Sequence, residues 1–220
     1  MKYFSTRNKK LDFNFKQIFQ RSLAPDGGLF LPKKIKKFSA NDLKSLKKLN
    51  YIDLAVAIIS SFCEPTFNKQ QLKILISKSY KKFKKKDVVS LVNIDKDILL
   101  ELYHGPTLAF KDIAMQCIGN IYEKFNEDNN DITNIVVATS GDTGAAAISA
   151  LSNRKNINLF VLHPHNKISK IQRKIMTTIG GKNIYNIAIN GSFDDCQKIV
   201  KQMFADNLFR QTINMSGVNS

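Results

Sequence analysis

Short apolar runs alternate with longer amphipathic stretches in the second half of the chain. Four runs have the length and apolar character of β-strands without a strict polar–apolar alternation, and they lie at residues 98–103, 135–138, 159–162 and 184–189. Such runs are typical of strands buried on both faces. Helical stretches are predicted between and after them, over residues 112–125, 143–151, 170–178 and 193–209. This rhythm predicts an α/β fold with an open, mostly parallel sheet and flanking helices.

The first half of the chain predicts a smaller, mainly helical segment. Ser39 and Asp53 are each expected to cap a short helix, because their side chains can accept hydrogen bonds from the backbone of a first turn. A third helix is expected to begin near Asn68 and to carry one apolar stripe, formed by Leu72, Leu75 and Ile76. The change of pattern divides the chain into residues 1–95 and residues 96–220.

Length and cysteine content narrow the class of protein. The chain has 220 residues and a mass of 24.9 kDa, enough for one large or two small domains. Its sequence contains no apolar run of about 20 residues that would cross a bilayer and no secretory signal at its start. The cysteines are Cys63, Cys117 and Cys196, with no Cys-x-x-Cys spacing. We therefore expect a reduced, cytoplasmic protein without a metal site or a membrane partner.

The net charge of +16 raises the question of a polyanionic partner. Lysine carries the excess, in runs at residues 33–37, 44–48 and 78–86, whereas arginine is the better residue for bidentate contacts with phosphate and bases. No aromatic stacking platform lies between these runs. We interpret them as solvated surface, with attraction for small anions as an alternative, and expect no nucleic-acid partner.

Two loops that lead from a predicted strand into a predicted helix hold the candidate chemistry, since ligands of open α/β sheets bind beyond the carboxyl ends of the strands. The first loop, residues 104–112, reads His-Gly-Pro-Thr-Leu-Ala-Phe-Lys-Asp and places Lys111 at a helix entrance among apolar neighbours. Apolar burial and a helix N-terminus both disfavour an ammonium group, and a neutral amine can attack an aldehyde. Lys111 is therefore a candidate Schiff-base lysine, against the alternative of an ordinary solvated one.

The second loop reads Ala-Thr-Ser-Gly-Asp-Thr-Gly and ends at Gly144. Gly141 and Gly144 would let the backbone approach a ligand, and Ser140 and Thr143 offer hydroxyl groups. Unpaired N–H groups at the following helix start favour a carboxylate or phosphate, and the small residues 145–147 would leave room for it. Ordinary helix capping is the alternative. The spacing is not that of a Walker phosphate-binding loop.

Together the two motifs closely resemble those of the threonine synthase family, which consists of pyridoxal-phosphate enzymes of fold type II, the tryptophan synthase β-like class. Other segments are similar to that family in the same order, at residues 3–7, 23–32, 164–177 and 191–197. The resemblance therefore covers the whole chain and implies the fold type II architecture.

The resemblance implies that Lys111 holds pyridoxal phosphate and then shuttles protons, and that Asp142 lies beside the cofactor. Four residues are then expected to contact the substrate, namely Ser140, Gly141, Thr143 and His104. The implied reaction converts O-phospho-L-homoserine and water to L-threonine and phosphate. Members of the family are much longer, so the resemblance further implies an amino-terminal fragment, inactive alone, whose loop for the cofactor phosphate lies beyond residue 220. The oligomeric state is left open.

Two other functions stay open at this point. The chain could belong to another phospho-amino-acid lyase of the same fold, or it could be a non-catalytic relative that binds an anion, if it truly ends at Ser220. His163 and His165 depart from the family pattern and are interpreted as local variation. Asp194 and Asp195, at a predicted helix start, are interpreted as capping residues.

Overall fold

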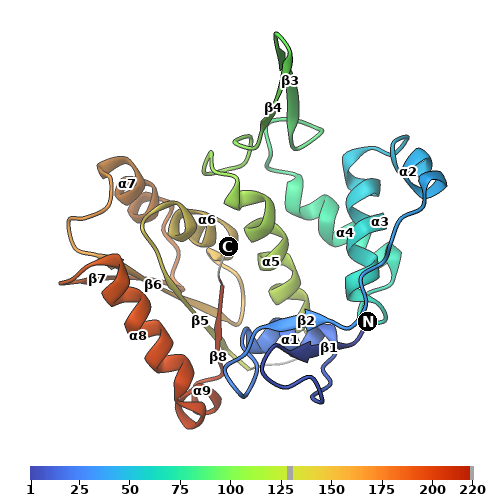
Figure 1. Cartoon of the computed structure of the whole chain (residues 1–220). Helices are drawn as coiled ribbons and strands as arrows, with labels where there is room; N and C mark the ends of the chain where they lie inside the picture. Colours follow the sequence, from blue (N-terminus) through green and yellow to red (C-terminus); the bar gives the residue numbers. More distant parts are fainter. Residues whose placement is uncertain (128–130, 219–220) are drawn as a thin grey trace. The chain divides into compact units, whose positions relative to one another are not determined.

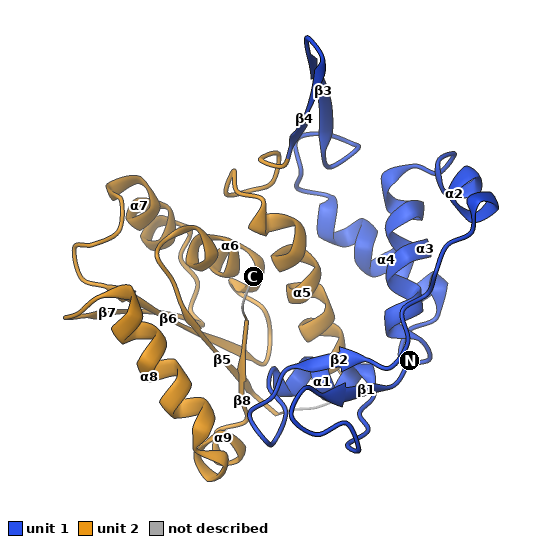
Figure 2. Ribbon diagram, in the orientation of Figure 1, with its two compact units in different colours: residues 1–101 blue, residues 102–220 orange. Residues whose placement is uncertain are grey.

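The computed structural model describes residues 1–127 and 131–218, and it divides the chain into two compact units, residues 1–101 and 102–220 (Figure 2). The boundary expected between residues 95 and 96 lies in the turn of a hairpin whose two strands both belong to the first unit.

Helices dominate the first unit. Its elements in chain order are β1 (Tyr3–Ser5), α1 (Phe15–Arg21), β2 (Phe30–Pro32), α2 (Ala40–Leu46), α3 (Tyr51–Cys63), α4 (Lys69–Tyr80), β3 (Ser90–Ile94) and β4 (Asp97–Glu101), as labelled in Figure 1. Strands β1 and β2 pair antiparallel. Helices α3 and α4 pack together, and α4 buries the predicted stripe of Leu72, Leu75 and Ile76.

Asparagine and serine side chains begin the longer helices of this unit. Ser39 caps α2 and Asn68 caps α4, as the sequence indicates. The expected cap at Asp53 is wrong. Asn50 caps α3 instead, and its Oδ1 accepts a hydrogen bond from the Asp53 N–H at 3.0 Å, so that helix starts earlier than its apolar pattern. Asp53 within the first turn was mistaken for the residue that precedes the helix.

The predicted strand at residues 98–103 does not belong to the parallel sheet. It forms β4, which pairs antiparallel with β3 in a two-stranded hairpin of the first unit. Leu91 lies opposite Leu100 and Val92 opposite Leu99, so both faces of the hairpin are apolar, and residues 91–100 are all exposed. An apolar run of this length is typical of a buried parallel strand, but it cannot by itself reveal which partner the strand takes.

Exposed apolar pairs on a hairpin favour self-association. Replacing Leu91 and Leu100 together by threonine is expected to reduce self-association in light scattering. The free energy of unfolding in urea should change by less than about 1 kcal/mol, because neither side chain is buried. Leu72→Thr, in the buried stripe of α4, serves as the control and should cost at least about 2 kcal/mol. Equal destabilisation by the two changes would contradict the exposed placement of the hairpin.

The second unit confirms the α/β fold with a parallel sheet. Its elements are α5 (Lys111–Asn126), β5 (Thr133–Ala138), α6 (Asp142–Leu151), β6 (Ile157–Pro164), α7 (Lys170–Ile179), β7 (Ile184–Ile189), α8 (Phe193–Ala205), α9 (Asn207–Thr212) and β8 (Met215–Gly217). The strands lie in the order β7-β6-β5-β8 and all neighbours are parallel. Helix α8 lies on the opposite side of the sheet from α5, α6 and α7 (Figure 1). The core is formed where α6 and α8 cover β5 and β6.

Two expectations for this unit are corrected. Strand β7 is an edge strand, and its four central residues are exposed, so it is not buried on both faces. The predicted helix over residues 193–209 is divided at Asp206, which ends α8 and whose side chain accepts from the Phe209 N–H at 2.9 Å to start α9. Apolar residues keep a helical spacing across Asp206, so the sequence pattern does not reveal that one helix ends and another begins there.

Candidate active site

Helices α5 and α6 pack against each other and run in the same direction, with both chain segments inside the second unit (Figure 1). The amide of Gln116 on α5 donates to the Ser149 hydroxyl on α6 at 3.3 Å. Farther along both segments, the Arg154 guanidinium, just after α6, donates to Asn120 at 3.1 Å and to Glu123 at 2.7 Å. Since the bonded positions advance together, the two helices are parallel and begin at the same end.

This arrangement brings the two sequence motifs to one edge of the sheet. Lys111 and Gly144 lie the same number of residues before the bonded pair Gln116 and Ser149. Packed helices have axes about 8–10 Å apart, so the first turns of α5 and α6 are neighbours. The lysine motif and the Ser-Gly-Asp-Thr-Gly motif therefore form one candidate site, at the carboxyl end of β5.

Lys111 is the first residue of α5, and no side chain caps this helix through a hydrogen bond. Its side chain is half-buried, and Nζ lies 4.9 Å from the centre of the exposed Phe110 ring. A cation over an aromatic face is attracted by the ring electrons. The amine thus lies at the rim of the helix start, partly shielded by an apolar ring yet within reach of a ligand.

The first loop folds back onto its own helix through Asp112, which is fully buried. Oδ2 of Asp112 accepts from the Thr107 N–H and Oδ1 accepts from the Thr107 hydroxyl, both at 2.8 Å. Burial raises the pKa of Asp112 above its ordinary value, although the hydrogen bonds from Thr107 act in the opposite direction. Sequence reasoning missed this residue. The signal was an acidic residue in the first turn after a Thr-containing loop.

The second loop is organised by Thr139, which sequence reasoning also missed. Its buried hydroxyl oxygen accepts from the N–H groups of Gly141 at 2.9 Å and Gly144 at 2.8 Å. The Thr143 N–H donates to Oδ1 of Asp142 at 2.9 Å. The expectation that unpaired amides at this helix start await an anion is therefore corrected for these three amides, because protein oxygens already accept from them.

The small residues of the second loop are used for protein packing. A Cβ atom on Gly141 would lie 2.3 Å from Oε1 of Gln172 on α7, and one on Gly144 would lie 2.6 Å from the Thr139 side chain and 2.8 Å from Met176. Residues 145–147 are buried in the core. The interpretation that small side chains leave room for a ligand is therefore corrected. The atoms that this loop offers outward are the exposed Ser140 hydroxyl and the half-buried Asp142 carboxylate.

The histidines take different positions. His104 is buried at the start of the first loop, with its ring 4.7 Å from that of Tyr103. It lies in the motif but its contact with substrate stays a prediction. His163 is buried near the end of β6, and its Nδ1 lacks a hydrogen-bond partner among the described residues, whereas His165 is exposed.

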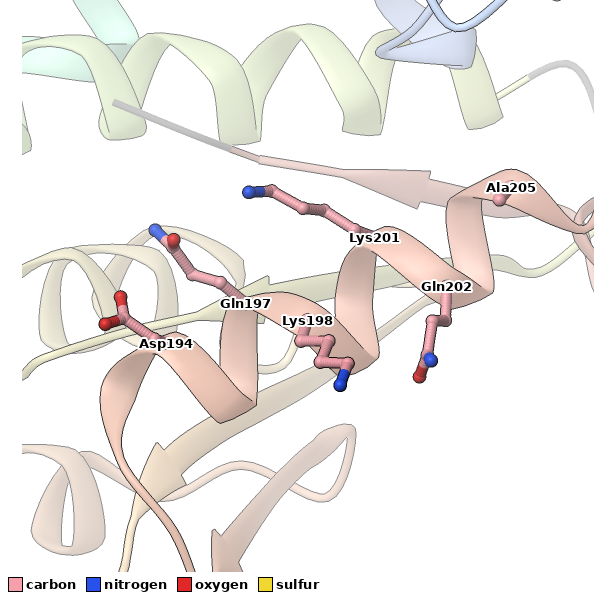
Figure 3. A pocket seen from close by; sticks show the side chains of 6 residues that line it. All are labelled: Asp194, Gln197, Lys198, Lys201, Gln202 and Ala205. Atoms are coloured by element: carbon pink, nitrogen blue, oxygen red, sulfur yellow. The ribbon is translucent and has the colours of Figure 1, made fainter.

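The predicted capping at the start of α8 is confirmed for Asp195. Its carboxylate accepts from the Ser192 N–H at 2.7 Å and from the Ser192 hydroxyl at 2.8 Å. These hydrogen bonds hold the pKa of Asp195 below its ordinary value. Asp194 is exposed and lies beside a shallow surface hollow along α8, which is also lined by Gln197, Lys198, Lys201, Gln202 and Ala205 (Figure 3). That hollow contains none of the predicted site residues.

Comparison with known families places the chain in a class of enzymes. The chain belongs to the pyridoxal-phosphate dependent enzyme family, whose model matches residues 93–218, more than half of its length. Within that class its likeness is to the threonine synthases, and residues 2–80 match the model described as threonine synthase N terminus. The recognised resemblance is confirmed by both matches.

Individual relatives cover the chain from end to end. The threonine synthase of Pseudomonas aeruginosa is 39% identical over 221 residues, which are all of this chain and 47% of the relative, and that of Saccharomyces cerevisiae is 40% identical over 99% of this chain and 46% of the relative. Threonine synthase-like 2 from Xenopus laevis is 36% identical, over all of this chain and 47% of the relative. The chain spans about half the length of the curated relatives it matches.

Solved structures agree with this assignment. The pyridoxal-phosphate-bound threonine synthase of Brucella melitensis superposes with a TM-score of 0.89 at 38% identity, covering all of this chain and 48% of that one. The threonine synthase of Escherichia coli gives a TM-score of 0.88 at 32% identity, over all of this chain and 50% of that one. The fold type II architecture implied by the resemblance is confirmed.

The described side chains fit one end of pyridoxal phosphate. Lys111 offers an amine for its aldehyde, while the Ser140 hydroxyl and the Asp142 carboxylate are polar partners suited to the atoms around it. A phosphate needs several N–H donors or cations, but the three amides described above are already bonded within the second loop. The residues fit the aldehyde end of the cofactor, and its phosphate would have to be held outside this loop.

The helices were compared with the length and apolar character that a membrane span needs. Across residues 1–127 and 131–218, no helix combines the length and the apolar character needed to cross a bilayer. Cys63, Cys117 and Cys196 are all free, and the described residues contain no group of three or more side chains suited to a metal ion. The lysine runs of the first unit are exposed at every lysine.

Proposed function

We propose that this chain forms the amino-terminal half of a threonine synthase, which converts O-phospho-L-homoserine and water to L-threonine and phosphate with pyridoxal phosphate. One observation carries the proposal. In a chain that threonine synthases match from end to end, parallel helices bring Lys111 to the same sheet edge as the loop from Ser140 to Thr143. The amine proposed to bind the cofactor and the polar loop proposed to bind the substrate are thereby neighbours.

The chemistry divides between the cofactor and the chain. When bound, pyridoxal phosphate acts as an electron sink that stabilises negative charge on substrate carbons. Lys111 binds the cofactor aldehyde, and its Nζ then accepts and returns protons, a role that its place at the rim of α5 permits. Asp142 orients the cofactor, while Ser140, Gly141 and Thr143, together with His104, contact the substrate.

The second loop is suited to contacts through side chains more than through amides. The Ser140 hydroxyl is exposed, whereas the Gly141 N–H is bonded to Thr139. The Asp142 carboxylate repels an anion that comes close to it, so the substrate phosphate would lie away from this residue. Phosphate binding is therefore assigned to other groups, including His104.

A second candidate function has a specific observation in its favour. The protein named threonine synthase-like 2 matches the whole chain at 36% identity, near the 39% of a threonine synthase. Sequence identity over this chain therefore does not separate the two, and another phospho-amino-acid lyase is the alternative. A non-catalytic anion-binding relative is a weaker alternative, because the candidate covalent lysine is present in its motif.

The substrate is best tested by comparing phosphate release from two phosphorylated amino acids. The full-length product of the gene that encodes this chain is expected to release phosphate from O-phosphohomoserine with a kcat/KM at least about 10-fold above that for O-phosphoserine, since the two compounds differ by one methylene group, which shifts the phosphate relative to the amino-acid group. A preference for O-phosphoserine would favour the other lyase. Binding of either compound without phosphate release would favour the non-catalytic relative.

The remaining partners follow from the proposed reaction. We place the protein in the cytoplasm, supported by three free cysteines, and assign it a small-molecule substrate. The exposed lysine runs are assigned to solvated surface, so no nucleic-acid or membrane partner is proposed.

A further inference from the structure

Asp112 stands beside the proposed cofactor lysine and is fully buried, whereas most aspartates of a helix start face solvent. Its two carboxylate oxygens accept hydrogen bonds from the backbone N–H and the hydroxyl of the same residue, Thr107, and the backbone of Leu108 and Ala109 also stabilises the carboxylate. A buried carboxylate is tolerated only where such donors compensate its lost hydration. The pair fixes a residue of the preceding loop onto the first turn of α5.

Three further features of the loop lie around this contact. Gly105 lies so close to Asp112 that an added Cβ would be 2.4 Å from Cβ and 2.5 Å from Oδ2 of Asp112. The Leu108 N–H donates to the Gly105 carbonyl at 3.2 Å, and Leu108 takes a left-handed backbone conformation with φ of 61°. A leucine in that conformation is uncommon and needs support from its surroundings. The loop before Lys111 thus packs closely against the Asp112 carboxylate.

We propose that Asp112 is a positioning residue for Lys111, acting through its two hydrogen bonds to Thr107, which hold the loop and so fix the direction from which the lysine side chain leaves α5. This role rests on the proposed function, because it gives Lys111 the covalent task. Asp112 itself is directed at the loop and touches neither substrate nor cofactor in this role. Gly105, Thr107 and Asp112 of the first loop would then all serve to hold this loop against the start of α5.

The arrangement has an energetic cost that a mere helix start would not require. Burial raises the pKa of Asp112. Because its folded pKa lies above the unfolded value, the burial lowers the free energy of unfolding at neutral pH, and this cost decreases as the pH falls from the folded pKa towards the unfolded one. An exposed aspartate at the same helix position would favour the helix dipole without that cost.

The role is testable by the reactivity of Lys111 towards an amine reagent. The full-length gene product, freed of cofactor with hydroxylamine, would be labelled in trace amounts with acetic anhydride over a range of pH. Lys111 would be compared by mass spectrometry with Lys170, the exposed first residue of α7. In the parent protein, partial burial should make Lys111 react more slowly. In Asp112→Ala we expect the ratio of Lys111 to Lys170 labelling to rise at least about threefold.

Three other variants separate positioning from folding and from charge. Asp112→Asn can accept from the Thr107 N–H and donate to its hydroxyl, so it should keep the parent ratio. Thr107→Val removes one hydrogen bond and should shift the ratio part of the way even if Asp112→Ala fails to fold, whereas Thr107→Ser should restore it. A parent labelling ratio in both Asp112→Ala and Thr107→Val would overturn the proposal, as would an Asp112→Asn ratio equal to that of a folded Asp112→Ala.

The labelling experiment is independent of the proposed reaction. It uses neither substrate nor bound cofactor, so a protein that fails to turn over O-phosphohomoserine could still show the predicted ratios. In that case the proposed function would fail while Asp112 would remain assigned to the placement of Lys111. Cofactor retention on gel filtration gives a second readout, and Asp112→Ala is expected to lose bound pyridoxal phosphate faster than Asp112→Asn.

Discussion

Lys111→Ala is expected to abolish threonine formation by the full-length gene product, lowering kcat by a factor on the order of 1,000 or more, as removal of a covalent catalytic residue does elsewhere. The physical reason is that alanine offers no amine to bind the aldehyde of the cofactor. The variant should also lose the absorbance of enzyme-bound pyridoxal phosphate. Phosphate release from O-phosphohomoserine and the visible spectrum are the two measurements.

Lys170→Ala provides a matched control for this prediction. Lys170 is likewise the first residue of a helix in the same unit, but it is exposed and lies outside both motifs. Its replacement should leave kcat and the spectrum within about twofold of the parent values. Reduction of the parent enzyme with borohydride should fix the cofactor on the peptide that contains Lys111. Cofactor on a different lysine, or activity retained in Lys111→Ala, would refute the assignment.

Gly141→Ala is expected to lower the free energy of unfolding by about 2–4 kcal/mol, combining backbone strain with overpacking. Gly141 has φ of 142°, a conformation that side chains other than glycine rarely adopt, and an added Cβ would lie 2.3 Å from Oε1 of Gln172. The measurement is urea unfolding of the full-length gene product. Because Gly141 precedes Asp142 at the start of α6, activity should fall as well.

Two further variants divide the cost of Gly141→Ala into its parts. Adding Gln172→Ala removes the clashing side chain, so the double variant should recover about half of the loss, whereas the backbone strain stays. Gly180→Ala isolates the strain, because Gly180 has φ of 66° but nothing closer to its Cβ position than a carbonyl oxygen at 4.0 Å. It should cost about 1–2 kcal/mol. A Gly141→Ala protein as stable as the parent would show that α7 does not pack on this loop.

The parallel sheet could be predicted because its central strands are buried on both faces, which removes polar residues from runs such as residues 135–138 and 159–162. The same criterion failed for β4, where an equally apolar run lies in an exposed hairpin. Sequence pattern reports how apolar a strand is, whereas its partner depends on contacts distant in the chain. Strand β8 is too short to give a pattern at all.

The residues of the candidate site were named from the sequence and stay predictions, whereas their hydrogen bonding could not be foreseen from it. Lys111 and the second loop stood out by motif, and the parallel helices bring them together. The expected amide cradle was not found at Gly141, Thr143 and Gly144, because hydrogen bonds from these groups to Thr139 and Asp142 depend on side-chain rotamers that no residue pattern specifies. Asp112 was overlooked since burial of an aspartate is visible only after folding.

The contact between Arg154 and Glu123 joins the α5 and α6 segments at the end that lies away from the candidate site. Burial lowers the pKa of Arg154 and the nearby Glu123 carboxylate opposes that effect, so the guanidinium remains charged and bound between the two segments. Lys111 is the first residue of α5, and Ser140 lies just before α6, so both lie at the other end of the two helices from this contact. A substitution at Glu123 would therefore remove one of the bonds that tie the two segments together far from the candidate site, without changing any residue of the site itself.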